Sequence, residues 1–126
     1  MDGTKLSESL FAALVTCNDE AVRKLCAPNF RASQNGGPAM DLDTLLGFNA
    51  AVHKAVRDFR YENPVRSATA TGFVEEHAVR GTLPDGSRLD LQVCVVAEVS
   101  GGKVTALREY LDGKAAEGLI RALSRG

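Results

Sequence analysis

Residues 81–112 read GTLPDGSRLDLQVCVVAEVSGGKVTALREYLD, and this stretch predicts two antiparallel hairpins in succession. Apolar residues recur at every second position through 88–99, the period-two pattern of a half-buried strand, and a second strand-length run of mixed apolar and polar residues follows at 103–112. Turn residues separate the runs, namely Pro84-Asp85-Gly86 and Gly101-Gly102. The stretch therefore predicts three long strands joined as a meander.

The N-terminal part of the chain has the period of helices. Apolar residues recur at helical spacing through 6–17 and again through 22–26, with Asn18-Asp19 between the two runs. This pattern predicts two short helices, the second capped by Asp19 and ended by Pro28. Residues 32–39 contain Gln-Asn-Gly-Gly-Pro and are expected to form a loop.

A third helix is predicted to begin after a cap at Asp41 or Asp43, and its apolar residues recur every three or four positions as far as Phe59. The strands expected are, in chain order, 60–70, 73–82, 88–99 and 103–112, followed by a short helix at 115–123. Helices followed by an antiparallel sheet indicate an α+β fold, and 126 residues form one domain, 1–126.

Composition excludes several classes of protein. The chain has 15 Lys and Arg against 16 Asp and Glu, so its net charge of -1 argues against a nucleic-acid partner. No apolar run approaches membrane-spanning length, and the N-terminus lacks the features of a secretory signal, so a cytoplasmic protein is expected. No metal-ligand spacing, phosphate-binding loop or nucleophile motif occurs, and neither a metal nor a cofactor is expected.

Three short segments carry a resemblance to a known family. The hairpin 81–86, the turn 98–104 and the ending Arg108-Glu109-Tyr110-Leu111-Asp112 resemble the SnoaL-like branch of the nuclear transport factor 2-like superfamily. The resemblance covers nearly the whole chain. It implies a cone-shaped α+β barrel, in which a strongly curved sheet encloses a pocket and its convex face makes a homodimer. Ketosteroid isomerases, polyketide cyclases and limonene epoxide hydrolases share this fold, so the fold does not fix the function.

The resemblance also places one functional residue. Asp112 falls where polyketide cyclases and epoxide hydrolases have an acid–base aspartate. The Arg-x-Asp pair of the epoxide hydrolases is not reproduced, because Glu76-His77-Ala78 stands in that neighbourhood. No counterpart to the base and oxyanion-hole residues of the ketosteroid isomerases is evident.

The turn at Gly101-Gly102 decides which residues of the last strand face the pocket. Leu91, Val93 and their alternate neighbours make the apolar, inner face of the strand 88–99. A two-residue turn pairs Val99 with Val104, and regular pairing then turns Arg108, Tyr110 and Asp112 inward. A three-residue turn would exchange the two faces.

The hairpin of the expected strands 73–82 and 88–99 likewise leaves two candidates for the residue that faces the pocket. A three-residue loop at Pro84-Asp85-Gly86 pairs Arg80 with Asp90 and turns His77 inward. A two-residue loop turns Glu76 inward instead.

These residues predict a pocket for a small apolar organic ligand. Asp112, at the end of an apolar face, is expected to carry a proton if burial raises its pKa, or else to cap the helix that follows. His77 is the second catalytic candidate, as a base, an acid or a hydrogen-bond donor. The predicted reaction is cofactor-free isomerisation, cyclisation, dehydration or hydrolysis of a carbonyl-type or epoxide ligand.

Other side chains are expected to bind the ligand. Tyr110 and Tyr61 offer phenol donors, Val93 an apolar wall, and Glu76 replaces His77 in the alternative register. Arg108 either neutralises an anionic ligand or pairs with a carboxylate of its own strand. The alternative function is a non-catalytic ligand-binding or assembly module of the same fold.

Overall fold

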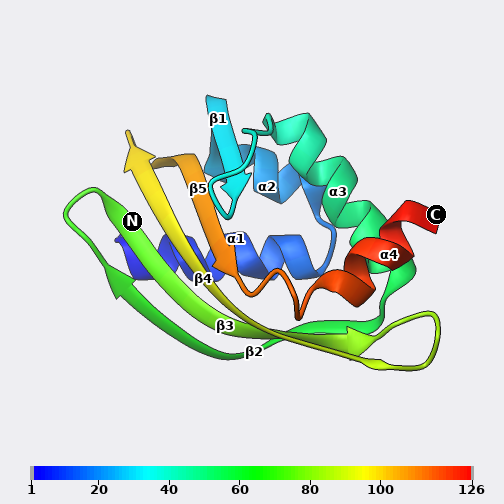
Figure 1. The fold of residues 1–126 in the computed structure, drawn as a ribbon. Coiled ribbons are helices and arrows are strands. Elements are labelled where there is room, and N and C mark those ends of the chain that lie inside the picture. The colour runs from blue at the N-terminus through cyan, green and yellow to red at the C-terminus, as the bar shows by residue number, and fades with distance from the viewer. Residues whose placement is uncertain (1, 126) are drawn as a thin grey trace.

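The computed structural model describes residues 2–125 (Figure 1). The helices are α1 (Gly3–Val15), α2 (Asp19–Leu25), α3 (Leu42–Ala55) and α4 (Glu117–Arg125). The strands are β1 (Cys26–Gln34), β2 (Arg57–Ala68), β3 (Gly72–Thr82), β4 (Arg88–Ser100) and β5 (Lys103–Leu111). The predicted α+β class is confirmed.

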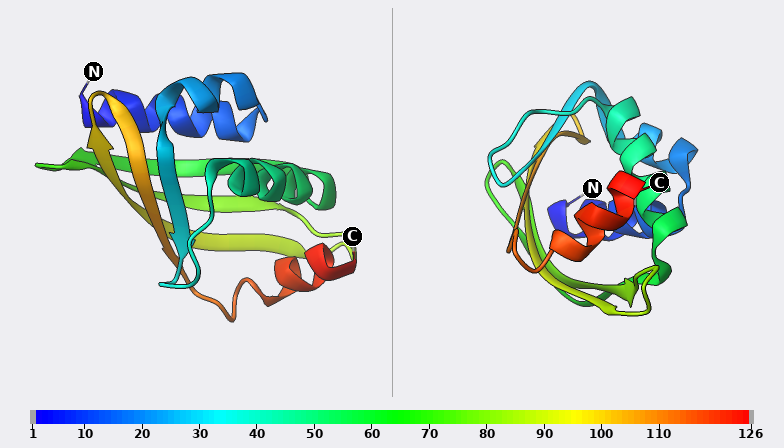
Figure 2. Two further views of the ribbon diagram at one scale, coloured as in Figure 1. Left: turned by 90° about the horizontal axis from the view of Figure 1, so that it is seen from above. Right: turned by 45° about the vertical axis from the view of Figure 1, so that its right-hand side comes forward.

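The strands form one sheet in the order β1-β5-β4-β3-β2, in which β1 runs parallel to β5 and the other pairs are antiparallel. The sheet curves around α1, while α3 and α4 lie at the wide end of the resulting cone (Figures 1 and 2). Leu6 and Leu10 of α1 are buried against the concave face together with Phe73 of β3. Burial of this apolar helix face holds α1 in the cone.

The strand β1 was not predicted, and the expected loop at 32–39 overlaps its last residues. Its pairing with β5 shifts between Cys26 and Arg31, so its residues do not alternate regularly between buried and exposed positions. β1 is also an edge strand, and it contains Pro28, which cannot donate to a sheet hydrogen bond. The sequence therefore lacks the period-two pattern on which the prediction of strands depends.

Two helix boundaries also differ from the prediction. The side chain of Asn18, not that of Asp19, accepts the capping hydrogen bond of α2 from the backbone of Ala21. Of the two caps considered for α3, Asp41 is the one observed. α3 ends at Ala55, so Phe59 belongs to β2, although its spacing continues the apolar stripe of the helix.

Of the two loop lengths considered for the β3–β4 hairpin, the structure has the three-residue loop. Thr82 pairs with Arg88 and Arg80 with Asp90, and the Arg80 guanidinium lies 3.3 Å from the Asp90 carboxylate. The alternating residues Leu89, Leu91, Val93, Val95 and Ala97 of β4 are buried, which confirms the predicted inner face.

The β4–β5 hairpin differs from the prediction one residue after its turn. Val99 pairs with Val104 as expected, but Glu98 then pairs with Ala106, and Thr105 is the extra residue of a β-bulge. One inserted residue moves every later side chain to the other face of the sheet. Leu107, Glu109 and Leu111 therefore face the concave side, where the prediction placed Arg108, Tyr110 and Asp112.

Candidate functional site

The wide end of the cone encloses a cavity of about 170 Å³ between the concave sheet, α1, α3 and α4. Its walls are mainly apolar and aromatic. The polar residues that line it are Ser33, Gln34, Asn49, Tyr61 and Glu109. No lysine, arginine or histidine of the described chain lines this cavity. A cavity with largely apolar walls and a few polar groups is typical of a small-molecule site.

Glu109 is the one carboxylate among the residues that line the cavity. It lies opposite Gln34 of β1 and Val95 of β4, and the Gln34 amide donates a 2.7 Å hydrogen bond to its carboxyl oxygen. Glu109 belongs to none of the ion pairs formed within residues 2–125. Burial raises the pKa of Glu109, and the bond from Gln34 and the His77 side chain oppose this rise only in part.

The residues predicted to lie on the inner face of β5 do not line the cavity. Asp112 follows the end of β5, is exposed, and accepts a 2.9 Å hydrogen bond from the backbone of Lys114. Arg108 pairs with Glu98 at 2.7 Å on the convex side, and Tyr110 is 45% exposed. Their predicted inward positions are wrong because the bulge at Thr105 exchanges the faces.

Tyr61 and Val93 do line the cavity. The Tyr61 ring contacts Phe11 and Phe59 edge to face, with ring centroids 5.5 and 5.3 Å apart. Burial raises the pKa of Tyr61 well above its usual range, and the nearby carboxylates Glu109 and Glu75 raise it further. The phenol is therefore a neutral hydrogen-bond donor at the cavity wall.

The register of the β3–β4 hairpin decides whether His77 or Glu76 faces inward. Glu76 is exposed on the convex face, whereas His77 points inward and is 3% exposed. The His77 ring packs against Phe11 and Tyr61, at centroid distances of 4.9 and 4.5 Å. These two rings line the cavity and His77 does not, so His77 supports the wall from behind.

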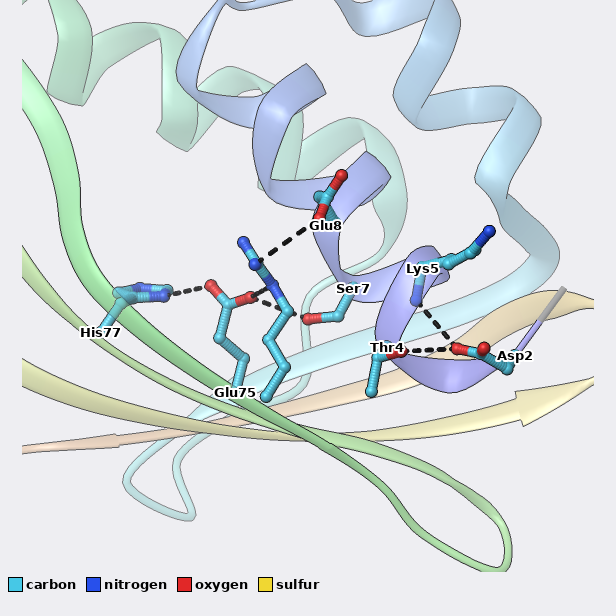
Figure 3. Close-up of polar contacts among 8 residues, drawn as sticks. Asp2, Thr4, Lys5, Ser7, Glu8, Glu75 and His77 are labelled. Carbon is cyan, nitrogen blue, oxygen red and sulfur yellow. Dashed lines mark hydrogen bonds and ion pairs between the residues drawn. The ribbon is translucent and has the colours of Figure 1, made fainter.

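The sequence reasoning missed Glu75, which is completely buried two residues before His77. Its carboxylate accepts hydrogen bonds from His77 Nδ1 at 2.6 Å, from the Ser7 hydroxyl at 2.9 Å and from Arg66 Nε at 2.5 Å. Figure 3 shows the Glu75 carboxylate between His77 and Ser7. A carboxylate only accepts, so Nδ1 of His77 carries a proton. The alternation that turns His77 inward also turns Glu75 inward, and this signal was available in the sequence.

The Glu75 network predicts a loss of stability in acid. Burial alone would raise the pKa of Glu75, but the bonds from His77, Ser7 and Arg66 lower it below its ordinary 4.5. The unfolded chain therefore binds this proton more readily than the folded protein does. The stability that ionised Glu75 gives the fold is complete above pH 4.5 and is lost as the pH falls through the lowered pKa. In urea titrations across this pH range, we expect the stability difference between wild type and Glu75→Gln to shrink in acid. The exposed Glu76→Gln is the control, and a difference for Glu75→Gln that is independent of pH would contradict the prediction.

Residues 2–125 contain no helix with the length and apolar character needed to cross a membrane. The structure is an α+β cone with a largely apolar cavity and one carboxylate in the cavity wall, which is the geometry of a candidate small-molecule site. The sequence profile of the SnoaL-like domain family matches residues 8–107, and the chain belongs to that family. This match confirms the resemblance inferred from the sequence.

Solved structures share the fold at low sequence identity. An NTF2-like protein from Burkholderia xenovorans is 17% identical, with a TM-score of 0.78 over 96% of this chain and 95% of that one. An LEH-like epoxide hydrolase of Mycobacterium tuberculosis is 17% identical, with a TM-score of 0.70 over 98% and 90%. A protein with a ketosteroid isomerase-like fold from Catenulispora acidiphila, in complex with trimethylamine, is 14% identical, with a TM-score of 0.72 over 83% of both chains.

Structures named after polyketide cyclases and an isomerase are also among the matches. Identities this low establish the fold alone. No curated protein matches the chain.

Proposed function

We propose that this protein binds a small, largely apolar carbonyl-type or epoxide ligand and performs cofactor-free acid–base chemistry on it, with Glu109 as the proton carrier. The observation that carries the proposal is a carboxyl group in a mainly apolar cavity, without a cationic partner and with a raised pKa. A carboxyl group whose pKa approaches the working pH exchanges protons efficiently with a bound ligand. Trimethylamine in one structural neighbour supports a small organic molecule as the occupant.

Glu109 takes the role that the sequence assigned to Asp112. In its neutral form it donates a proton or a hydrogen bond to a ligand oxygen, and as the carboxylate it accepts a proton in return. Tyr61 supplies a second donor to the same oxygen, and Val93 with its apolar neighbours excludes water.

Turnover by the isolated protein tests this proposal. Protein dialysed against a chelator is expected to convert at least one member of a panel of cyclic ketones, enones and epoxides, as followed by product chromatography. Asp112→Asn is expected to leave the rate unchanged, because Asp112 is exposed and bonded to the backbone of Lys114. Ligand binding without conversion of any panel member would favour the alternative, a non-catalytic binding or assembly module.

We also propose a cytoplasmic homodimer formed through the convex face of the sheet. Tyr110 is exposed on this face, beside the half-buried Cys94 with which it pairs, and Val96 lies next along β4. Light scattering is expected to give the mass of two chains, and Tyr110→Glu is expected to lower it toward that of one chain because it buries a charge in the interface. A wild-type mass of one chain at all concentrations would contradict this.

A further inference from the structure

The lining of the cavity contains acidic groups and no basic side chain among the described residues. The titratable residues that line it are Glu109 and Tyr61, and the basic side chains of residues 2–125 lie outside the lining. Arg66, the cation nearest to the buried Glu75, is already bonded to that carboxylate. His77, behind the wall, is bonded to the same carboxylate and opposes the raised pKa of Glu109 only in part, so Glu109 is the one carboxylate of the lining and has no basic side chain of residues 2–125 bonded to it.

The same cavity has aromatic walls set at right angles. Tyr61 makes interplanar angles of 85° with Phe11 and 78° with Phe59, and all three rings line the cavity with Phe48. The faces of aromatic rings carry partial negative charge and attract organic cations, most strongly where water is excluded. Rings from α1, α3 and β2 thus surround a space whose one carboxylate has no cationic partner.

We infer that the ligand of this cavity carries a small organic cation, a protonated or quaternary amine, which lies among these rings and pairs with Glu109. The inference rests on the proposed ligand-binding function and names the charge of its ligand. The cation supplies the partner that Glu109 lacks among the residues of the cavity. Anionic ligands are excluded, because no basic side chain in the lining would compensate their charge.

Binding of a cation also changes the protonation of Glu109. The raised pKa keeps more of Glu109 neutral in the free protein than at an exposed site, and a neighbouring positive charge favours the carboxylate. Glu109 therefore releases a proton to the buffer when the cation binds. The occupied cavity then holds a carboxylate base beside its ligand.

Two ligands of equal shape, one charged and one neutral, separate the effect of ligand charge on affinity from the effect of ligand shape. Choline and 3,3-dimethylbutan-1-ol have the same branched head and hydroxyl, but only choline is charged. Calorimetric titration of the full chain at a pH near the pKa of Glu109 is expected to give choline at least about tenfold tighter binding. Titration in buffers of different ionisation enthalpy is expected to show proton release with choline and none with the alcohol.

Two variants complete the test. Glu109→Gln retains the size of the side chain, and is expected to abolish the proton release and to reduce the preference for choline to the part that the aromatic rings supply. Glu20→Gln, at an exposed position on α2, is expected to change neither. Choline binding that is no tighter than that of the alcohol, or that is equally tight in Glu109→Gln, overturns the inference. Either result leaves the proposed catalysis intact, because turnover of uncharged ketones and epoxides by the wild type decides that separately.

Discussion

Glu109→Gln is expected to lower kcat/KM for any substrate that the wild type converts by about 10²- to 10⁴-fold, the usual contribution of one general acid–base group. The glutamine retains the hydrogen-bonding position opposite Gln34 and fills the same volume, but it cannot exchange a proton. Affinity for an uncharged ligand is therefore expected to change little. Steady-state kinetics together with equilibrium binding of the same compound measure the two effects separately.

The pH dependence of this variant provides an independent check. An acid with a raised pKa in the folded protein stabilises the fold fully below its ordinary pKa, and this contribution is lost as the pH rises through the raised value. Glu109→Gln should therefore become more stable relative to wild type as the pH rises through this interval. Asp112→Asn is the matched control at an exposed position. Wild-type kinetics in Glu109→Gln would contradict the assignment of the proton carrier.

Glu75→Ala is expected to reduce the free energy of unfolding by about 3–5 kcal/mol, the range found when one partner of a buried ion pair is removed. The Glu75 side chain is fully buried and accepts from His77, Ser7 and Arg66, so the substitution leaves three donors without their acceptor. It also leaves a cavity beneath α1. Urea unfolding followed by circular dichroism measures the loss.

The neighbouring Glu76→Ala is the control for this prediction. Glu76 is exposed on the convex face of the same strand, and its replacement is expected to change stability by less than about 0.5 kcal/mol. Equal losses for the two variants would show that the buried network contributes no more than a surface carboxylate.

The sequence was sufficient to predict the class of fold and the buried face of β4, and it reduced the β3–β4 hairpin to two registers, one of which the structure has. Pro84, Asp85 and Gly86 favour a turn between these strands, and a three-residue loop there pairs Arg80 with Asp90 and turns His77 inward, but the turn residues did not exclude the two-residue loop. The clear alternation of β4 identified its buried face. This alternation placed Val93 at the cavity, whereas Tyr61 was proposed only as a phenol donor on an apolar wall.

The position of Glu109 in the cavity wall depends on the β-bulge at Thr105, which leaves no signal in the pattern of apolar and polar residues. Both faces of β5 mix apolar and charged residues, since Leu107 and Leu111 flank Glu109 on one face while Ala106 and Tyr110 flank Arg108 on the other. Alternation therefore does not reveal the bulge at Thr105, and without it the wrong face is assigned to the cavity. The strand pairing in the structure shows which face of β5 is concave, because Glu109 lies opposite the buried Val95.

The pKa of Glu109 in the ligand-free protein tests the central claim most directly. Carboxyl-carbon NMR titration, with Glu109→Gln to assign the resonance, measures it without any knowledge of the ligand. A half-buried carboxyl group in the cavity wall without a cationic partner is predicted to titrate clearly above the ordinary value of 4.5. A pKa at or below that value would contradict the role of Glu109 as the proton carrier of this cavity.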